Sequence, residues 1–224
     1  MSGKSLAKST GIRDNGSTFF SQKFLQKSKG ETAMQELKDR IVKEGKVLPG
    51  NIIKVDGFLN HRIDTELMEH IAEEFGRHFN MDEVTMILTA EASGIALSAI
   101  VARHFNKPMI FAKKAKSDNI EGGLYQSDIF SYTYKKKVTL LVSKEWFSSE
   151  DKVLIIDDFM ANGEAMRGLC DIVDKAGATL VGIGCAVEKG FQGGGDRLRA
   201  AGVNLKSLAI IESAEPGNIV FREN

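Results

Sequence analysis

The chain contains little of what marks a secreted, disulfide-bonded or membrane-spanning protein. Its 224 residues include two cysteines, Cys170 and Cys185, which lie in apolar segments without metal-ligand spacing. We expect both to be reduced core residues, as is usual in the cytoplasm. No apolar run approaches the roughly 20 residues that cross a bilayer, and the N-terminus lacks the apolar centre of a signal peptide. The sequence therefore predicts a cytoplasmic protein without a membrane partner.

The chain also lacks net charge and clustered histidines. Thirty Lys and Arg residues balance thirty Asp and Glu residues, so there is no positive field for nucleic acid and no acidic excess typical of disorder. The four histidines do not group with acidic or cysteine partners at metal-ligand spacing. Ser93 lies outside the Gly-x-Ser-x-Gly pattern of hydrolases. A hydrolase and a nucleic-acid-binding protein are both disfavoured, and any ligand must be recognised by local groups.

Residues 1–33 differ in composition from the rest of the chain. They carry six Lys or Arg residues against Asp14 and Glu31, together with frequent Ser and Gly. Residues 34–224 hold 24 basic and 28 acidic residues, a net charge of −4. We predict that 1–33 is a disordered leader or extension and that 34–224 forms one α/β domain.

Apolar spacing predicts alternating helices and strands. Helices are expected over 34–44, 65–79, 95–105, 165–176 and 196–201. Strands are expected over 84–89, 109–112, 179–187 and 205–211, and another begins at Val153. The runs 127–134 and 138–143 predict an antiparallel hairpin, and 47–60 is a candidate lid. The expected architecture is a mainly parallel sheet flanked by helices, with an inserted antiparallel hairpin.

The most informative segment is 153–165, which reads Val-Leu-Ile-Ile-Asp-Asp-Phe-Met-Ala-Asn-Gly-Glu-Ala. A buried strand carries its last residues to the carboxyl edge of a sheet, where carboxylates meet solvent and ligand. The following loop and helix N-terminus offer N–H groups to a phosphate, and Gly163 lets the backbone come close. The pattern predicts a ribose 5-phosphate site, with the hydroxyls at Asp157 and Asp158 and the phosphate at Ala161, Asn162, Gly163, Glu164 and Ala165. The alternative is an acidic pair that only caps the next helix.

This stretch resembles the hallmark of the type I phosphoribosyltransferases, and the resemblance runs from Met34 to the C-terminus. Asn162 replaces the usual Thr, and Glu164-Ala165 replaces the usual Gly-Thr, as in the xanthine branch of the family. Without those two hydroxyl donors, more of the phosphate contact falls on backbone N–H groups. The resemblance implies transfer of ribose 5-phosphate from phosphoribosyl pyrophosphate to xanthine, with guanine as a weaker substrate. It also implies magnesium bound mainly through phosphoribosyl pyrophosphate rather than by protein ligands, and a homodimer.

Three further groups of residues match the family. The turn Glu91, Ala92, Ser93 and Gly94 lies between a strand and a helix and resembles the pyrophosphate-binding loop. The segment 113–126 resembles the flexible loop that closes over the reacting centre, with candidate contacts from Lys113, Lys114 and Lys116. The base pocket is assigned to Ile53 and Asn60 in an N-terminal hood (34–63), to Lys189, which can donate to an oxo group, and to Phe191, which can stack.

Two other functions remain open at this stage. Some transcription regulators that sense phosphoribosyl pyrophosphate share this fold and a similar Asp-Asp-Phe-Met stretch. A regulator would need a DNA-binding module, yet the basic segment 1–33 has no helix-turn-helix pattern. An enzyme acting on adenine is disfavoured because the Lys189 ammonium is a donor and would oppose the amino group of adenine.

Overall fold

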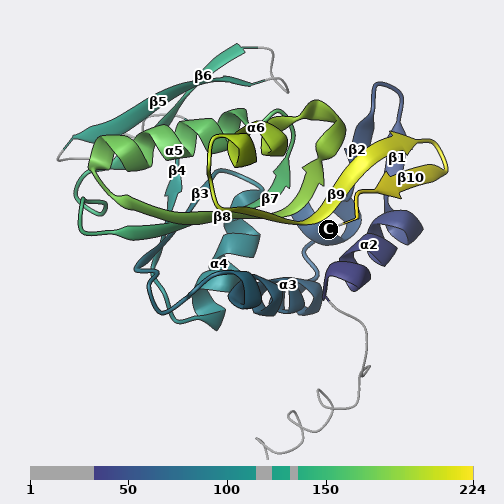
Figure 1. The fold of residues 1–224 in the computed structure, drawn as a ribbon, viewed down its shortest axis with the longest axis horizontal. Helices are drawn as coiled ribbons and strands as arrows, with labels where there is room; N and C mark the ends of the chain where they lie inside the picture. Colours follow the sequence, from purple (N-terminus) through teal and green to yellow (C-terminus); the bar gives the residue numbers. More distant parts are fainter. Residues whose placement is uncertain (1–32, 115–122, 132–135, 224) are drawn as a thin grey trace, which may run out of the picture. The chain divides into compact units, whose positions relative to one another are not determined.

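The fold is built on a six-stranded sheet in the order β10-β9-β8-β7-β3-β4 (Figure 1). The computed structural model describes residues 33–114, 123–131 and 136–223. The strands are β3 (Met86–Ala90), β4 (Met109–Ala112), β7 (Lys152–Met160), β8 (Thr179–Lys189), β9 (Leu205–Glu215) and β10 (Asn218–Phe221). All neighbours are parallel except β10, which is antiparallel to β9. The predicted mainly parallel sheet is confirmed.

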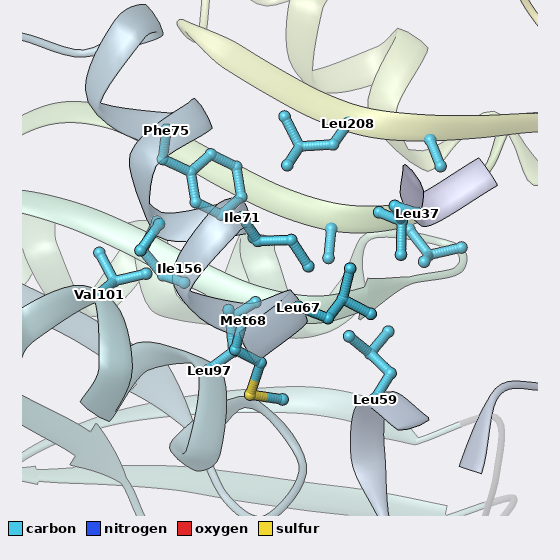
Figure 2. Packing of buried hydrophobic residues seen from close by; sticks show 14 of the residues in the cluster. Leu37, Leu59, Leu67, Met68, Ile71, Phe75, Leu97, Val101, Ile156 and Leu208 are labelled. Carbon is cyan, nitrogen blue, oxygen red and sulfur yellow. The ribbon is translucent and has the colours of Figure 1, made fainter. Parts of the chain in front are cut away.

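Helices cover both faces of this sheet, which explains the unbroken apolar runs of its central strands. Helices α3 (Thr65–His78) and α4 (Gly94–His104) lie on one face, and α5 (Glu164–Ala176) lies on the other (Figure 1). Alternate residues of β7 therefore enter two cores: Leu154 and Ile156 pack with α3 and α4, and Val153 and Ile155 pack with α5. Figure 2 shows the first core, in which side chains of α3 and α4 meet Ile156 and Leu208.

The N-terminal hood consists of helix α2 (Ala33–Glu44), a hairpin of β1 (Lys46–Leu48) and β2 (Ile52–Lys54), and a π-helical turn η1 (Asp56–Asn60). Its buried side chains extend the first core; they include Leu37, Ile41, Ile53, Phe58 and Leu59. Asp64 caps α3 by accepting the Leu67 N–H at 3.2 Å, and it also accepts from Arg40 Nη1 at 3.0 Å. The α2 helix is thus tied to the start of α3.

The predicted inserted hairpin is confirmed as β5 (Leu124–Ser131) and β6 (Lys136–Ser143), which pair antiparallel and lie over α5 (Figure 1). The expected strand residues 132–134 fall outside the described residues. Close packing on α5 requires Gly168, because a Cβ there would lie 2.5 Å from Ile129 Cγ2 and 2.9 Å from Leu140 Cδ1. The hairpin belongs to the second core.

Several strands are longer than expected. β7 continues through Asp157 and Asp158 to Met160, because pairing with β8 persists as far as Met160 and Glu188. β8 and β9 also run past their predicted ends, and β10 was not predicted. Ladder pairing with a neighbouring strand holds these polar residues extended against their weak strand propensity. A short 3-10 turn η2 (Gly190–Gln192) and helix α6 (Gly194–Ala200) connect β8 to β9.

Among the described residues, no helix is long and apolar enough to cross a membrane.

Candidate active site

The acidic pair is buried inside β7. Asp157 is 7% exposed and Asp158 is 1% exposed, so the expectation that both carboxylates meet solvent at a strand end was wrong. The strand continues past them, and the loop before α4 and the hood cover them. A buried carboxylate needs hydrogen-bond donors. The donors to these two carboxylates show which segments the acidic pair holds together.

Asp158 joins three segments that are far apart in sequence. Its Oδ1 accepts from Ser93 Oγ at 2.8 Å, and its Oδ2 accepts from Asn60 Nδ2 at 3.0 Å. Ser93 lies in the turn predicted to bind pyrophosphate, and Asn60 ends the hood turn η1. The structure therefore brings together residues from three of the predicted groups around one carboxylate.

Asp157 is held by the backbone instead. Its Oδ1 accepts the N–H of Asp158 at 3.0 Å. A Cβ at Gly94 would overlap both Asp157 Oδ1 and Thr89 Oγ1, so only glycine allows α4 to start this close. Burial raises the pKa of Asp157 well above its usual value, and the neighbouring charge of Asp158 raises it further. A positively charged group placed here would be stabilised by the pair.

The turn from Glu91 to Ser93 connects β3 to α4, as predicted, and its Glu91-Ala92 peptide bond is cis. Glu91 Oε1 accepts the N–H of Lys114 at 2.5 Å. This hydrogen bond connects the turn to the start of the predicted flexible loop, 113–126. Lys113 exchanges two backbone hydrogen bonds of 2.9 Å with Leu141 of β6. Lys116 lies outside the described residues, and Lys114 lines a cavity of about 420 Å³ along the β5–β6 hairpin.

The predicted phosphate loop forms a tight turn into α5. Gly163 has φ +79°, a left-handed conformation that favours glycine. The Glu164 carboxylate is held by its own neighbours: Oε2 accepts from Arg167 Nη2 at 3.0 Å and from the Phe130 N–H at 3.4 Å. The hydrogen bond from Arg167 lowers the pKa of Glu164. An acidic residue can therefore stand in this loop while the backbone N–H groups remain available to an anion.

The alternative role for the acidic pair, capping of α5, was wrong. No side chain caps α5 at Gly163, and the Asp158 carboxylate oxygens accept from Ser93 and Asn60 instead.

The residues predicted to contact the base lie around the end of β8, beside the hood. Lys189 Nζ donates to the Asn51 carbonyl at 3.1 Å and lies 5.5 Å from the centre of the Phe159 ring. Burial lowers the pKa of Lys189. Ile53 is buried in the first core, and Phe191 in η2 packs against the same core. Base contacts by Ile53, Asn60, Lys189 and Phe191 stay predictions.

Thr89, Phe159 and Arg197 were not among the predicted site residues. Phe159 directly follows the acidic pair, and an aromatic residue there was a usable signal. Thr89 Oγ1 is buried without a partner among the described residues, next to Gly94. Arg197 Nη2 donates to the Asn162 carbonyl at 2.9 Å. The two residues are 35 positions apart in the sequence, so no local pattern predicts this contact.

Comparisons with known proteins agree with this geometry. The phosphoribosyl transferase domain family matches residues 56–200. Curated relatives named xanthine phosphoribosyltransferase include one from Bifidobacterium adolescentis, 52% identical over 84% of this chain and 100% of its own length. Another, from Lachnoclostridium phytofermentans, is 53% identical over 84% of this chain and 98% of its own length.

Solved structures share the fold. Adenine phosphoribosyltransferase from Giardia lamblia has a TM-score of 0.66 at 19% identity, covering 80% of this chain and 97% of that one. The enzyme from Trypanosoma brucei has a TM-score of 0.62 at 23% identity, covering 80% and 79%. The chain has the type I phosphoribosyltransferase fold and belongs to the phosphoribosyltransferase family, alongside the curated xanthine phosphoribosyltransferases.

Proposed function

We propose that the protein transfers ribose 5-phosphate from phosphoribosyl pyrophosphate to xanthine, giving xanthosine 5′-monophosphate and pyrophosphate. The names of relatives at about 50% identity support xanthine as the base. The observation that carries the site assignment is Asp158, whose carboxylate gathers Ser93 and Asn60 beside the phosphate loop. The sensing-regulator alternative finds no support among these relatives.

Each part of the site has a distinct role in this reaction. The N–H groups at the start of α5 bind the 5′-phosphate, and the turn at Glu91–Gly94 binds pyrophosphate. Asp157 and Asp158 bind the ribose hydroxyls and stabilise positive charge that develops at the anomeric carbon. Catalysis then rests on positioning and electrostatics and needs no covalent bond to the protein.

Phosphoribosyltransferases generally use Mg²⁺ with phosphoribosyl pyrophosphate. The described residues contain no group of three or more His, Cys, Asp or Glu side chains that could hold a metal ion. Their chemistry fits an ion that takes most of its oxygen ligands from the substrate, as Mg²⁺ does with phosphates. Asp157 and Asp158, at the proposed ribose site, are the carboxylates that could offer a further ligand. The ion would neutralise charge on the leaving pyrophosphate.

The base pocket favours an oxopurine. The Lys189 ammonium is a donor, which suits an oxo group of xanthine and opposes the amino group of adenine. Asn60 donates Nδ2 to Asp158, which leaves its Oδ1 as an acceptor for a base N–H. Guanine, with one oxo group, should be a weaker substrate than xanthine. We also propose that the active unit is a homodimer and that 34–224 contains the whole catalytic domain.

The proposal is tested by offering xanthine, guanine, hypoxanthine and adenine separately to the purified protein with Mg²⁺ and phosphoribosyl pyrophosphate. Nucleotide formation is measured by chromatography. We expect strong preference for xanthine and no product with adenine. Tight donor binding without turnover of any base would overturn the enzyme assignment and favour a sensor of phosphoribosyl pyrophosphate.

A further inference from the structure

The segment after β8 lies directly on the phosphate loop. A Cβ at Gly194 would be 2.6 Å from the carbonyl carbon of Asn162 and 2.7 Å from the nitrogen of Gly163. These distances are too short for any side chain, so the backbone of α6 lies flat against the Asn162–Gly163 peptide. The position of α6 is therefore coupled to the shape of the loop.

Arg197 extends from α6 to the same peptide. Its Nη2 donates to the Asn162 carbonyl at 2.9 Å, and its Nη1 donates to the Gln192 carbonyl at 3.4 Å. Arg197 is otherwise exposed to solvent. A charged donor makes a stronger bond to a carbonyl than a neutral donor does.

Holding this carbonyl fixes the direction of an N–H group. In a planar trans peptide the C=O and the N–H point in opposite directions, and the Asn162–Gly163 peptide is trans. Arg197 therefore directs the Gly163 N–H to the side away from its own guanidinium. The next carbonyl, that of Gly163, accepts the Arg167 N–H at 2.8 Å, which orients the Glu164 N–H in the same manner.

We propose that Arg197 is a positioning residue for the 5′-phosphate: it holds the Asn162 carbonyl so that the Gly163 N–H faces the phosphate of the sugar donor. This inference deepens the proposed function and rests on it. The role has particular weight here, because Asn162 and Ala165 supply no hydroxyl donors and more of the phosphate contact therefore falls on backbone N–H groups. Arg167 orients one peptide of the loop from within α5, and Arg197 orients the preceding peptide from α6.

The test compares two ligands that use different parts of the site. Ribose 5-phosphate uses the α5 loop, whereas pyrophosphate uses the turn at Glu91–Gly94. Isothermal titration calorimetry on the full chain measures the dissociation constants of both for wild type, Arg197→Ala, Arg197→Lys and the control Arg103→Ala. Arg103 is exposed near the C-terminal end of α4, at the opposite end of that helix from the turn.

For Arg197→Ala we expect roughly tenfold weaker binding of ribose 5-phosphate, the scale of a lost charge-assisted hydrogen bond, and pyrophosphate binding unchanged within about twofold. The KM for phosphoribosyl pyrophosphate should rise in parallel, while the KM for xanthine should stay constant. Arg197→Lys should recover part of the loss, since it keeps a charged donor, and Arg103→Ala should match wild type.

Unchanged ribose 5-phosphate binding in Arg197→Ala would overturn the assignment. Equal losses for both ligands together with a lower melting temperature would also overturn it, because they would reveal a purely structural role. If wild type turns over xanthine and Arg197→Ala binds ribose 5-phosphate as wild type does, only this inference is refuted. A wild-type protein that forms no nucleotide and binds no ribose 5-phosphate refutes the proposed function itself.

Discussion

Two small antiparallel hairpins stand outside the central sheet, and they are attached to the molecule in different ways. The hood hairpin β1–β2 and the turn after it belong to the first core. Asn60 of the turn contacts Asp158 of the acidic pair, and Asn51 of the hairpin contacts Lys189. The β5–β6 hairpin belongs to the second core and rests on α5, whose first residue ends the phosphate loop. The proposed base side and the proposed sugar-phosphate side of the site are thus supported by separate cores. Changes to the two hairpins should affect the two substrates separately.

The largest expected effect is at Asp158, where the two sides meet. Asp158→Asn removes the charge and replaces one acceptor oxygen with a donor, so Ser93 and Asn60 can no longer both donate to it. We expect kcat/KM to fall by about 10²- to 10³-fold, as when a preorganised electrostatic group is lost from an active site. Steady-state kinetics with each substrate varied in turn measures the loss. A decrease under tenfold would contradict the assigned role.

The hood side is tested next, at Asn60. Asn60→Ala removes the bond to Asp158 and the proposed contact with the base, so we expect the KM for xanthine to rise about tenfold, equivalent to about 1.4 kcal/mol. The dissociation constant of ribose 5-phosphate should change less than threefold. The matched control is Asn80→Ala, which removes an exposed amide that hydrogen-bonds to the nearby Glu83 side chain and Asp82 N–H. If the sugar-phosphate and the base lose affinity equally, the separation of the two sides is wrong.

The hairpin side is tested at Gly168. Gly168→Ala places a Cβ against Ile129 and Leu140, and both side chains must move. Overpacking of this kind costs about 1–3 kcal/mol, and we expect a similar decrease in the free energy of unfolding in urea. The KM for phosphoribosyl pyrophosphate should rise while the KM for xanthine is unaffected. A variant as stable as wild type would show that the hairpin does not rest on α5 in solution.

The sequence predicted the parts of this site that depend on chain order and local chemistry. The strand, acidic pair, loop and helix of 153–176 follow from apolar runs and chain order, and Gly163 follows from the close backbone approach expected at a phosphate. The burial of Asp158 was not predictable, because it depends on Asn60 and Ser93, which lie 98 and 65 positions away. Arg197 was not predicted for the same reason. Nothing in the local sequence of a short helix shows that an exposed arginine will donate to a distant carbonyl. Local patterns identified segments, whereas contacts between segments required the fold.

The smallest change in the free energy of unfolding is expected at Asp157, where function and stability should oppose each other. Burial and the Asp158 charge raise the pKa of Asp157 above its unfolded value. The stabilising contribution of its protonated form is therefore complete below the unfolded pKa and is lost as the pH rises through the folded pKa. Asp157→Asn keeps an oxygen to accept the Asp158 N–H and has no charge to bury. At neutral pH it should increase the free energy of unfolding by about 1 kcal/mol while abolishing most activity. Urea unfolding between pH 4 and pH 8 should show this advantage growing with pH. An advantage that shrinks as the pH rises would mean that the Asp157 carboxylate is stabilised in the folded protein, and the charge next to Asp158 would then be favourable rather than costly.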